Sequence, residues 1–256
     1  MHTHAAERTK DGTSLWLLHI TDNHLFTDLS EGRHGVSSFD AFQQVLASAT
    51  AARKPDLVVD TGDIAHDRTR EVYEMFMSTV REFVDCPLIA TPGNHDLDEP
   101  FDQVLSRETV TMKGWQIVTV DTHIDDTVSG LVSQEELNRL EVELGANDSP
   151  TLVVGHHPAA DIGCAWIDAH RIDNGDEFLT KLQTYRHVKG YLAGHVHQAF
   201  EGHVNGIRLM TTPSTCWQFK TDSDSFAVDD LRAGWRWLEL RADGELDSHV
   251  ERLVDA

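Results

Sequence analysis

The chain has 256 residues and a mass of 28.7 kDa, which suffices for one large domain or two small ones with a substantial core. Its 43 acidic residues outnumber 21 lysines and arginines, and the net charge of −22 argues against nucleic acid and anionic membranes as partners. The three cysteines, Cys86, Cys164 and Cys216, are far apart and form no C-x-x-C motif, so we expect reduced thiols rather than a disulfide framework or a zinc ribbon.

Residues 1–12 are polar and contain no motif, so we predict a flexible N-terminal tail followed by a single domain over residues 13–256. The first apolar run, residues 15–18, is far too short for a membrane span or for the apolar core of a signal peptide. No repeat, low-complexity tract or linker interrupts the chain after it. We therefore expect a cytoplasmic protein with no membrane partner.

Short apolar runs that end in polar residues alternate with helical patterns along the chain. We predict strands over residues 15–20, 56–59, 86–90, 115–120, 151–154, 191–193, 206–212 and 234–241, and a last run through residue 250. Apolar spacing predicts helices over residues 38–53 and 71–84, and Ser133 with Glu136 forms a capping-box signature for a third helix. This alternation predicts a layered α/β fold, which places ligands at the carboxyl ends of its strands.

Six of the predicted strand ends carry residues of the kinds that bind metal ions, and one of them has only Asp121 after residues 115–120. The motifs at the other five are Asp22-Asn23-His24, Gly62-Asp63, Gly93-Asn94-His95-Asp96, Gly155-His156-His157-Pro158 and Gly194-His195-Val196-His197. Carboxylate, amide and imidazole groups are all metal ligands, and one carboxylate can bridge two cations with its two oxygens. Each motif alone fits a capped turn or a hydrogen-bonded histidine equally well. Their combination predicts a metal centre.

The motif order D-x-H, G-D, G-N-H-D, G-H-x-P and G-H-x-H resembles the calcineurin-like metallophosphoesterase superfamily. Residues 163–168, 174–177, 212–216, 218–220 and 234–236 further resemble bacterial 3′,5′-cyclic-AMP phosphodiesterases of the Icc/CpdA type, the class III cyclic nucleotide phosphodiesterases. The likeness extends from about Leu15 to Val254. It implies a four-layer sandwich of two mixed β-sheets flanked by helices.

The resemblance also implies two divalent or trivalent metal ions per subunit, iron or manganese, with zinc as the alternative that the ligand types also suit. The first ion would be held by Asp22, His24, Asp63 and His197. The second would be held by Asp63, Asn94, His156 and His195. Asp63 would therefore bridge the two ions.

The implied reaction is hydrolysis of cyclic AMP to 5′-AMP by in-line attack of a metal-bridging hydroxide on phosphorus. Asp63 and His95 are the catalytic residues in this scheme, and His95 would act as the acid or stabilise the phosphate oxygens. Substrate contacts are expected from His24, Asp63, Asn94, His95 and His197. The wider superfamily orients the histidine of G-N-H-D with an aspartate where this chain has His66, and the nearest aspartate, Asp67, is one residue further on. The residue that orients His95 stays open.

Three further residues are weaker candidates for substrate binding. His157 could contact the phosphate, but a buried and hydrogen-bonded histidine is an equal interpretation. Trp166 and His170 could lie against the adenine, although ordinary core packing explains Trp166 equally well.

An alternative function is that of a related metallophosphoesterase that acts on another phosphodiester, a phosphomonoester or a nucleotide-sugar pyrophosphate. A metal-bound regulatory subunit without turnover is a third reading, which nothing in the intact motifs favours. The sequence does not distinguish cyclic AMP from cyclic GMP. It also leaves open whether the protein forms a homo-oligomer and whether its acidity reflects a saline host.

Overall fold

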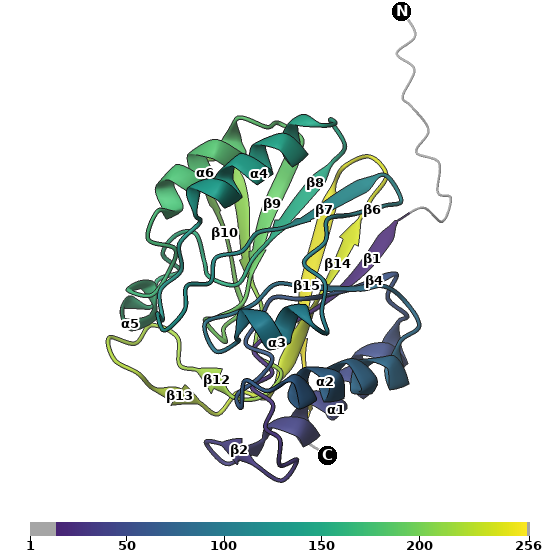
Figure 1. Cartoon of the computed structure of the whole chain (residues 1–256), viewed down its shortest axis with the longest axis vertical. Coiled ribbons are helices and arrows are strands. Elements are labelled where there is room, and N and C mark those ends of the chain that lie inside the picture. The colour runs from purple at the N-terminus through teal and green to yellow at the C-terminus, as the bar shows by residue number, and fades with distance from the viewer. Residues whose placement is uncertain (1–13, 255–256) are drawn as a thin grey trace, which may run out of the picture.

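The computed structural model of the chain describes residues 14–254, so the predicted tail at residues 1–12 lies outside the described residues. Two mixed β-sheets lie face to face, and helices cover the outer face of each (Figure 1). This arrangement confirms the predicted four-layer α/β sandwich. Two small two-stranded sheets, β2–β3 and β12–β13, lie outside the main layers.

The first sheet has the strand order β15-β14-β1-β4-β5, in which β1, β4 and β5 run parallel. Its strands are β1 (Leu15–Ile20), β4 (Leu57–Asp60), β5 (Leu88–Ala90), β14 (Gly234–Leu240) and β15 (Leu246–Arg252). The second sheet has the order β10-β11-β9-β8-β7-β6, and its four central strands are parallel. Its strands are β6 (Val110–Met112), β7 (Trp115–Thr119), β8 (Thr151–Val154), β9 (Val188–Ala193), β10 (Phe200–Val204) and β11 (Ile207–Thr211).

The helices complete the two outer layers. They are α1 (Ser38–Ala52), α2 (Arg70–Phe83), α3 (Asp98–Asp102), α4 (Gln134–Gly145), α5 (Ala165–Asp168) and α6 (Gly175–Gln183). The small sheets consist of β2 (Gly32–Arg33), β3 (Val36–Ser37), β12 (Gln218–Phe219) and β13 (Val228–Asp229). Within residues 14–254, no helix combines the length and the apolar character needed to cross a bilayer.

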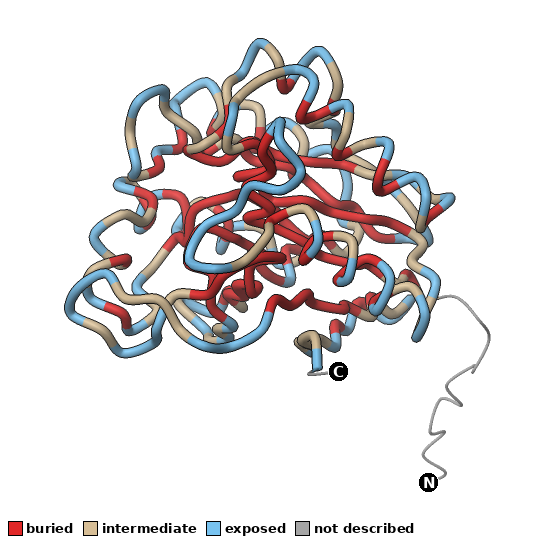
Figure 2. The backbone as a smooth tube through the Cα atoms, turned by 90° about the horizontal axis from the view of Figure 1, so that it is seen from below, coloured by how far each residue is buried: buried red, intermediate tan, exposed pale blue. Residues whose placement is uncertain are grey.

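The apolar strands bury side chains on both faces, as parallel strands between two layers must. Alternate residues of β4 illustrate the pattern, because Leu57 and Val59 belong to the core between the sheets and Val58 to the core under α1 and α2. A third core joins the second sheet to α4 and α6. Figure 2 shows the buried strands between the more exposed outer segments.

Most predicted elements are present with small shifts at their ends. Strand β1 has the predicted bounds, and helices α1 and α2 differ from prediction by one residue at an end. Ser133 caps α4 by accepting the Glu136 amide at 3.1 Å, but the Glu136 side chain pairs with Arg139 and does not reach back to the cap. Strands β2, β3, β6, β10, β12 and β13 and helices α3, α5 and α6 were not among the predicted elements. The three cysteines are free thiols, as predicted.

Candidate metal centre

The five strand-end motifs meet at one edge of the two sheets, after β1, β4, β5, β8 and β9. Asp22, His24, Asp63, His195 and His197 all have φ between 44° and 67°. This left-handed region costs a residue with a side chain roughly 1–2 kcal/mol. Hydrogen bonds hold the turns in place, because Asp22 N donates to Gly62 O and His24 N to Asp63 O, both at 2.9 Å.

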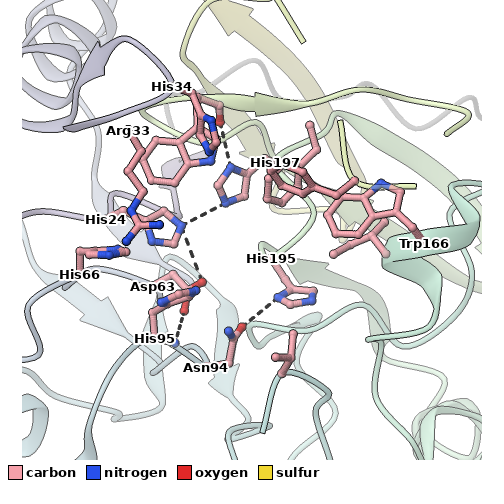
Figure 3. Close-up of a pocket in the computed structure, with 15 residues that line it drawn as sticks. His24, Arg33, His34, Asp63, His66, Asn94, His95, Trp166, His195 and His197 are labelled. Carbon is pink, nitrogen blue, oxygen red and sulfur yellow. Dashed lines mark hydrogen bonds and ion pairs between the residues drawn. The ribbon is translucent and has the colours of Figure 1, made fainter. Parts of the chain in front are cut away.

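One group of ligand atoms gathers Asp22, His24 and His197, all within 4.8 Å of one another. His197 Nε2 lies 3.3 Å from Asp22 Oδ1. It also lies 3.1 Å from His24 Nε2 (Figure 3). His197 Nδ1 donates to the carbonyl oxygen of Trp217 at 2.8 Å. This hydrogen bond leaves the Nε2 lone pair of His197 directed at Asp22 and His24.

A second group contains Asn94, His156 and His195. Asn94 Oδ1 lies 3.2 Å from His156 Nε2 and 3.0 Å from His195 Nδ1. His156 Nδ1 donates to the carbonyl oxygen of Thr61 at 2.6 Å, which orients the Nε2 lone pair toward Asn94.

Asp63 lies between the two groups and faces each with a different oxygen. Its Oδ1 is 3.5 Å from His156 Nε2, and its Oδ2 is 3.8 Å from His24 Nε2. The structure therefore brings together all seven residues that the sequence analysis identified as metal ligands, and each is at most 7 % exposed. They are Asp22, His24, Asp63, Asn94, His156, His195 and His197.

The chemistry of these groups fits bound cations. His24 and His195 each direct one ring nitrogen, Nε2 and Nδ1 respectively, at the ligand groups, and the other nitrogen of each ring is buried without a hydrogen-bond partner among the described residues. Burial holds the pKa of both histidines well below 6.5, so they are neutral imidazoles with free lone pairs. Burial also lowers the pKa of His156, but the adjacent Asp63 carboxylate outweighs burial and raises that pKa to about 9. The site thus favours positive charge next to Asp63.

The loop that carries Asn94 and His95 is anchored by Asp96. This buried carboxylate accepts hydrogen bonds from Gly93 N at 2.9 Å, Ala65 N at 3.0 Å and the Tyr73 hydroxyl at 2.9 Å. The backbone amide of His95 donates to Asp63 Oδ1 at 2.7 Å. The loop is therefore tied to both α2 and the turn after β4.

The ring of His66 stacks on the ring of His95, with centroids 5.6 Å apart and planes 23° apart. Asp67 instead accepts the backbone amide of Thr27 at 2.7 Å. The His24 ring lies nearer to the His95 ring, edge-on with centroids 4.9 Å apart, so His95 has an imidazole neighbour on each of two elements of the site.

A cavity of about 380 Å³ is lined by five of the seven residues, and Asp22 and His156 lie beneath its surface. Its floor includes His24, Asp63, Asn94, His95, His195 and His197. Trp166 lies across the cavity from His24 in Figure 3, and its ring packs edge-on against Phe219 at 5.0 Å and Phe226 at 5.4 Å. We call Trp166, Phe219 and Phe226 the aromatic wall.

The other weak candidates lie elsewhere. His157 is fully buried, and its ring nitrogens lie 2.8 Å from Thr122 Oγ1 and 3.1 Å from the carbonyl oxygen of Val128. His170 is not among the described residues that line the cavity. The structure brings Trp166, but neither His157 nor His170, to the cavity surface.

Sequence reasoning missed several lining residues, namely Arg33, His34, His66, Trp217, Phe219 and Phe226. The His34-Gly35 pair is a plausible hairpin turn in the sequence, and Phe219 lies in a segment that carried the family resemblance. Neither signal indicated a side chain directed into a cavity.

Comparisons with known proteins agree with this arrangement. The calcineurin-like phosphoesterase family matches residues 15–199. The 3′,5′-cyclic adenosine monophosphate phosphodiesterase CpdA of Escherichia coli is 37% identical over 93% of this chain and 90% of its own length. A 3′,5′-cyclic-nucleotide phosphodiesterase of Nostoc sp. is 33% identical over 91% of each chain. Among solved structures, a dimetal phosphatase from Danio rerio has the same fold, with a TM-score of 0.64 at 16% identity over 88% of this chain and 95% of that one.

Proposed function

The chain belongs to the calcineurin-like phosphoesterase family, and we propose that it hydrolyses 3′,5′-cyclic AMP to 5′-AMP at a centre of two metal ions. The observation that carries the proposal is the position of Asp63, which faces two groups of ligand atoms on the floor of one cavity. The name of the Escherichia coli relative, a cyclic AMP phosphodiesterase, supports the choice of substrate.

We assign Asp22, His24 and His197 to one ion and Asn94, His156 and His195 to the other, with Asp63 shared between them. Iron or manganese suits this mixture of oxygen and nitrogen ligands, and zinc is the alternative. Such cations would neutralise phosphate charge and lower the pKa of water at the site. The hydrogen bonds from His156 to Thr61 and from His197 to Trp217 keep the ligand nitrogens correctly directed.

His95 is the residue we assign to the leaving group. It lines the cavity beside Asp63, and its backbone is held there by the hydrogen bond to the Asp63 carboxylate. Its imidazole would donate a proton to the ribose 3′ oxygen as the bond from that oxygen to phosphorus breaks. His66 limits the rotation of the His95 ring by stacking against it.

The aromatic wall is the part of the cavity that suits the base. Trp166, Phe219 and Phe226 offer flat apolar surface beside the polar floor, where the Phe219 ring stacks on the His197 ring at 4.2 Å, and an adenine is flat and largely apolar. In protein complexes with single-stranded nucleic acids, stacking of one base on an aromatic side chain contributes about 1–3 kcal/mol. We therefore place the base against this wall and the phosphate over Asp63.

Turnover of cyclic AMP by protein reconstituted with manganese or iron tests the proposal, with 5′-AMP measured by chromatography and an aryl phosphodiester assayed alongside. Asp63→Asn and His95→Gln should lose AMP formation. Asp67→Asn and His170→Gln are matched controls, because Asp67 does not contact the His95 ring and His170 lies outside the cavity lining. Hydrolysis of the aryl ester alone would retain the metal centre and reject cyclic AMP as substrate.

A further inference from the structure

Arg33 differs from every other residue that lines the cavity. It is the one arginine or lysine among the described lining residues, and it belongs to the β2–β3 hairpin. Figure 3 shows its guanidinium beside His24 and His66, on the polar side of the cavity and away from Trp166. Among the described residues, Arg33 is therefore the position at which an arginine or lysine side chain of the protein reaches the cavity.

No carboxylate within residues 14–254 forms an ion pair with Arg33. Acidic residues outnumber basic ones two to one in this chain, and the half-buried Arg107 and Arg139 each pair with several carboxylates. Arg33 has neither a hydrogen bond nor an ion pair with any described residue. An exposed guanidinium without a carboxylate partner remains available to an anion in the cavity.

The hairpin is built so that this residue is held at the cavity. His34 and Gly35 have φ of 54° and 79°, and they connect the paired residues Arg33 and Val36 as a two-residue turn of type I′. Asparagine or glycine is usual at the His34 position, so a histidine there adds strain of roughly 1–2 kcal/mol. Its ring packs 5.4 Å from the Trp217 ring and 5.8 Å from the Phe226 ring, which fixes the hairpin against the cavity rim.

We propose that Arg33 is a substrate-binding residue that contacts the phosphate group and binds the product phosphate more strongly than the substrate phosphate. This inference rests on the proposed function, since it requires a phosphoester in the cavity. The planar guanidinium matches two phosphate oxygens at once. A cyclic phosphodiester carries one negative charge, whereas a phosphomonoester carries up to two, so the same arginine attracts 5′-AMP more than cyclic AMP.

Two substitutions and a matched control test the proposal. Arg33→Gln removes the positive charge. Arg33→Lys keeps the charge but lacks the planar guanidinium group that can contact two oxygens at once. Arg186→Gln removes an equally exposed arginine that precedes β9, at the opposite end of this strand from His195. Each manganese-loaded protein is assayed for KM, kcat and inhibition by AMP, and calorimetry measures its binding of inorganic phosphate and AMP at low and high KCl.

For Arg33→Gln we expect binding of AMP and phosphate to weaken about tenfold, which is typical of the loss of one charge-assisted hydrogen bond. KM for cyclic AMP should rise less than this, kcat should change little, and the salt dependence of binding should decrease. Arg33→Lys should recover part of the loss, and Arg186→Gln should behave as wild type. Circular dichroism and metal content should be unchanged in all three variants.

The proposal would be overturned if Arg33→Gln bound phosphate and AMP as tightly as Arg186→Gln does. So would a loss confined to cyclic AMP, which would indicate a contact with the base instead, or a wild-type protein that binds no phosphate. If the wild type binds phosphate but does not hydrolyse cyclic AMP, the proposed function fails. The calorimetric comparison then still decides the role of Arg33.

Discussion

Replacement of Gly93 by alanine should disable the metal centre while the fold survives. Gly93 precedes Asn94 in the loop after β5, with Asp63 and His156 on either side. A Cβ atom at this position would lie 2.2 Å from Asp63 Oδ1, 2.5 Å from Asp63 N and 2.6 Å from His156 Cε1. Ordinary contact begins near 3.4 Å, so both the carboxylate and the backbone of Asp63 would have to retreat by about 1 Å.

The size of the effect follows from which atoms must move. The backbone of Gly93 has no positive φ, so alanine meets only the spatial conflict. Overpacking of this kind typically costs about 1–3 kcal/mol of stability. A displacement of about 1 Å in a reacting centre costs about 100-fold in rate. We therefore expect Gly93→Ala to lose metal and about 100-fold in kcat/KM, while its unfolding free energy falls by no more than about 3 kcal/mol.

The assay combines metal content per chain by mass spectrometry, kcat/KM for cyclic AMP and urea denaturation. Gly145→Ala is the matched control, because a Cβ at this end of α4 meets no atom within 4 Å. The reasoning would be refuted if Gly93→Ala kept the metal content and the kcat/KM of Gly145→Ala.

Three further predictions concern stability. Tyr73→Phe removes a donor to Asp96 Oδ1 and should lower the unfolding free energy by about 1–3 kcal/mol in urea, and an unchanged midpoint would contradict this. Burial, assisted by the charge of Arg236, holds the pKa of His19 well below 6.5 in the folded state, so below pH 6.5 the unfolded chain binds a proton that the folded chain does not. The free energy of unfolding should therefore fall as pH drops below 6.5, and it should fall less steeply in His19→Gln than in the wild type. Equal slopes of unfolding free energy against pH in the two proteins would contradict this prediction. Chelation by EDTA should lower the thermal midpoint and Mn²⁺ should restore it, whereas a midpoint indifferent to both would argue against bound metal.

The convergence of the motifs could be predicted because it depends on local patterns and one general rule. Short apolar runs identify the strands, and the carboxyl ends of parallel strands share an edge. Asp121 shows the limit of this reasoning, because it also follows a predicted strand, β7. It pairs with Arg107 in a separate polar cavity instead. Strand order decides this difference, since β7 lies beyond β8 and away from β9, and no local pattern encodes the order.

The substrate side of the cavity was harder to predict for a different reason. Strands β2 and β3 have two residues each, too few to show a period in the sequence. Their position depends on contacts of His34 with Trp217 and Phe226, which are distant in the chain. Phe226 is 55% exposed, so apolar patterning assigns it to no core. Tertiary packing, which the sequence does not show, places the cavity-lining residues of such loops.

The left-handed backbone at five proposed ligands costs the fold stability, whereas the side chains at the same positions are proposed to serve activity. Glycine at any of these positions would relieve the backbone, and it would also remove a ligand. Selection for heat tolerance alone would therefore favour replacements at the very residues that we propose as metal ligands. On this proposal, a copy of the chain released from selection for turnover should lose the proposed ligands before it loses its fold.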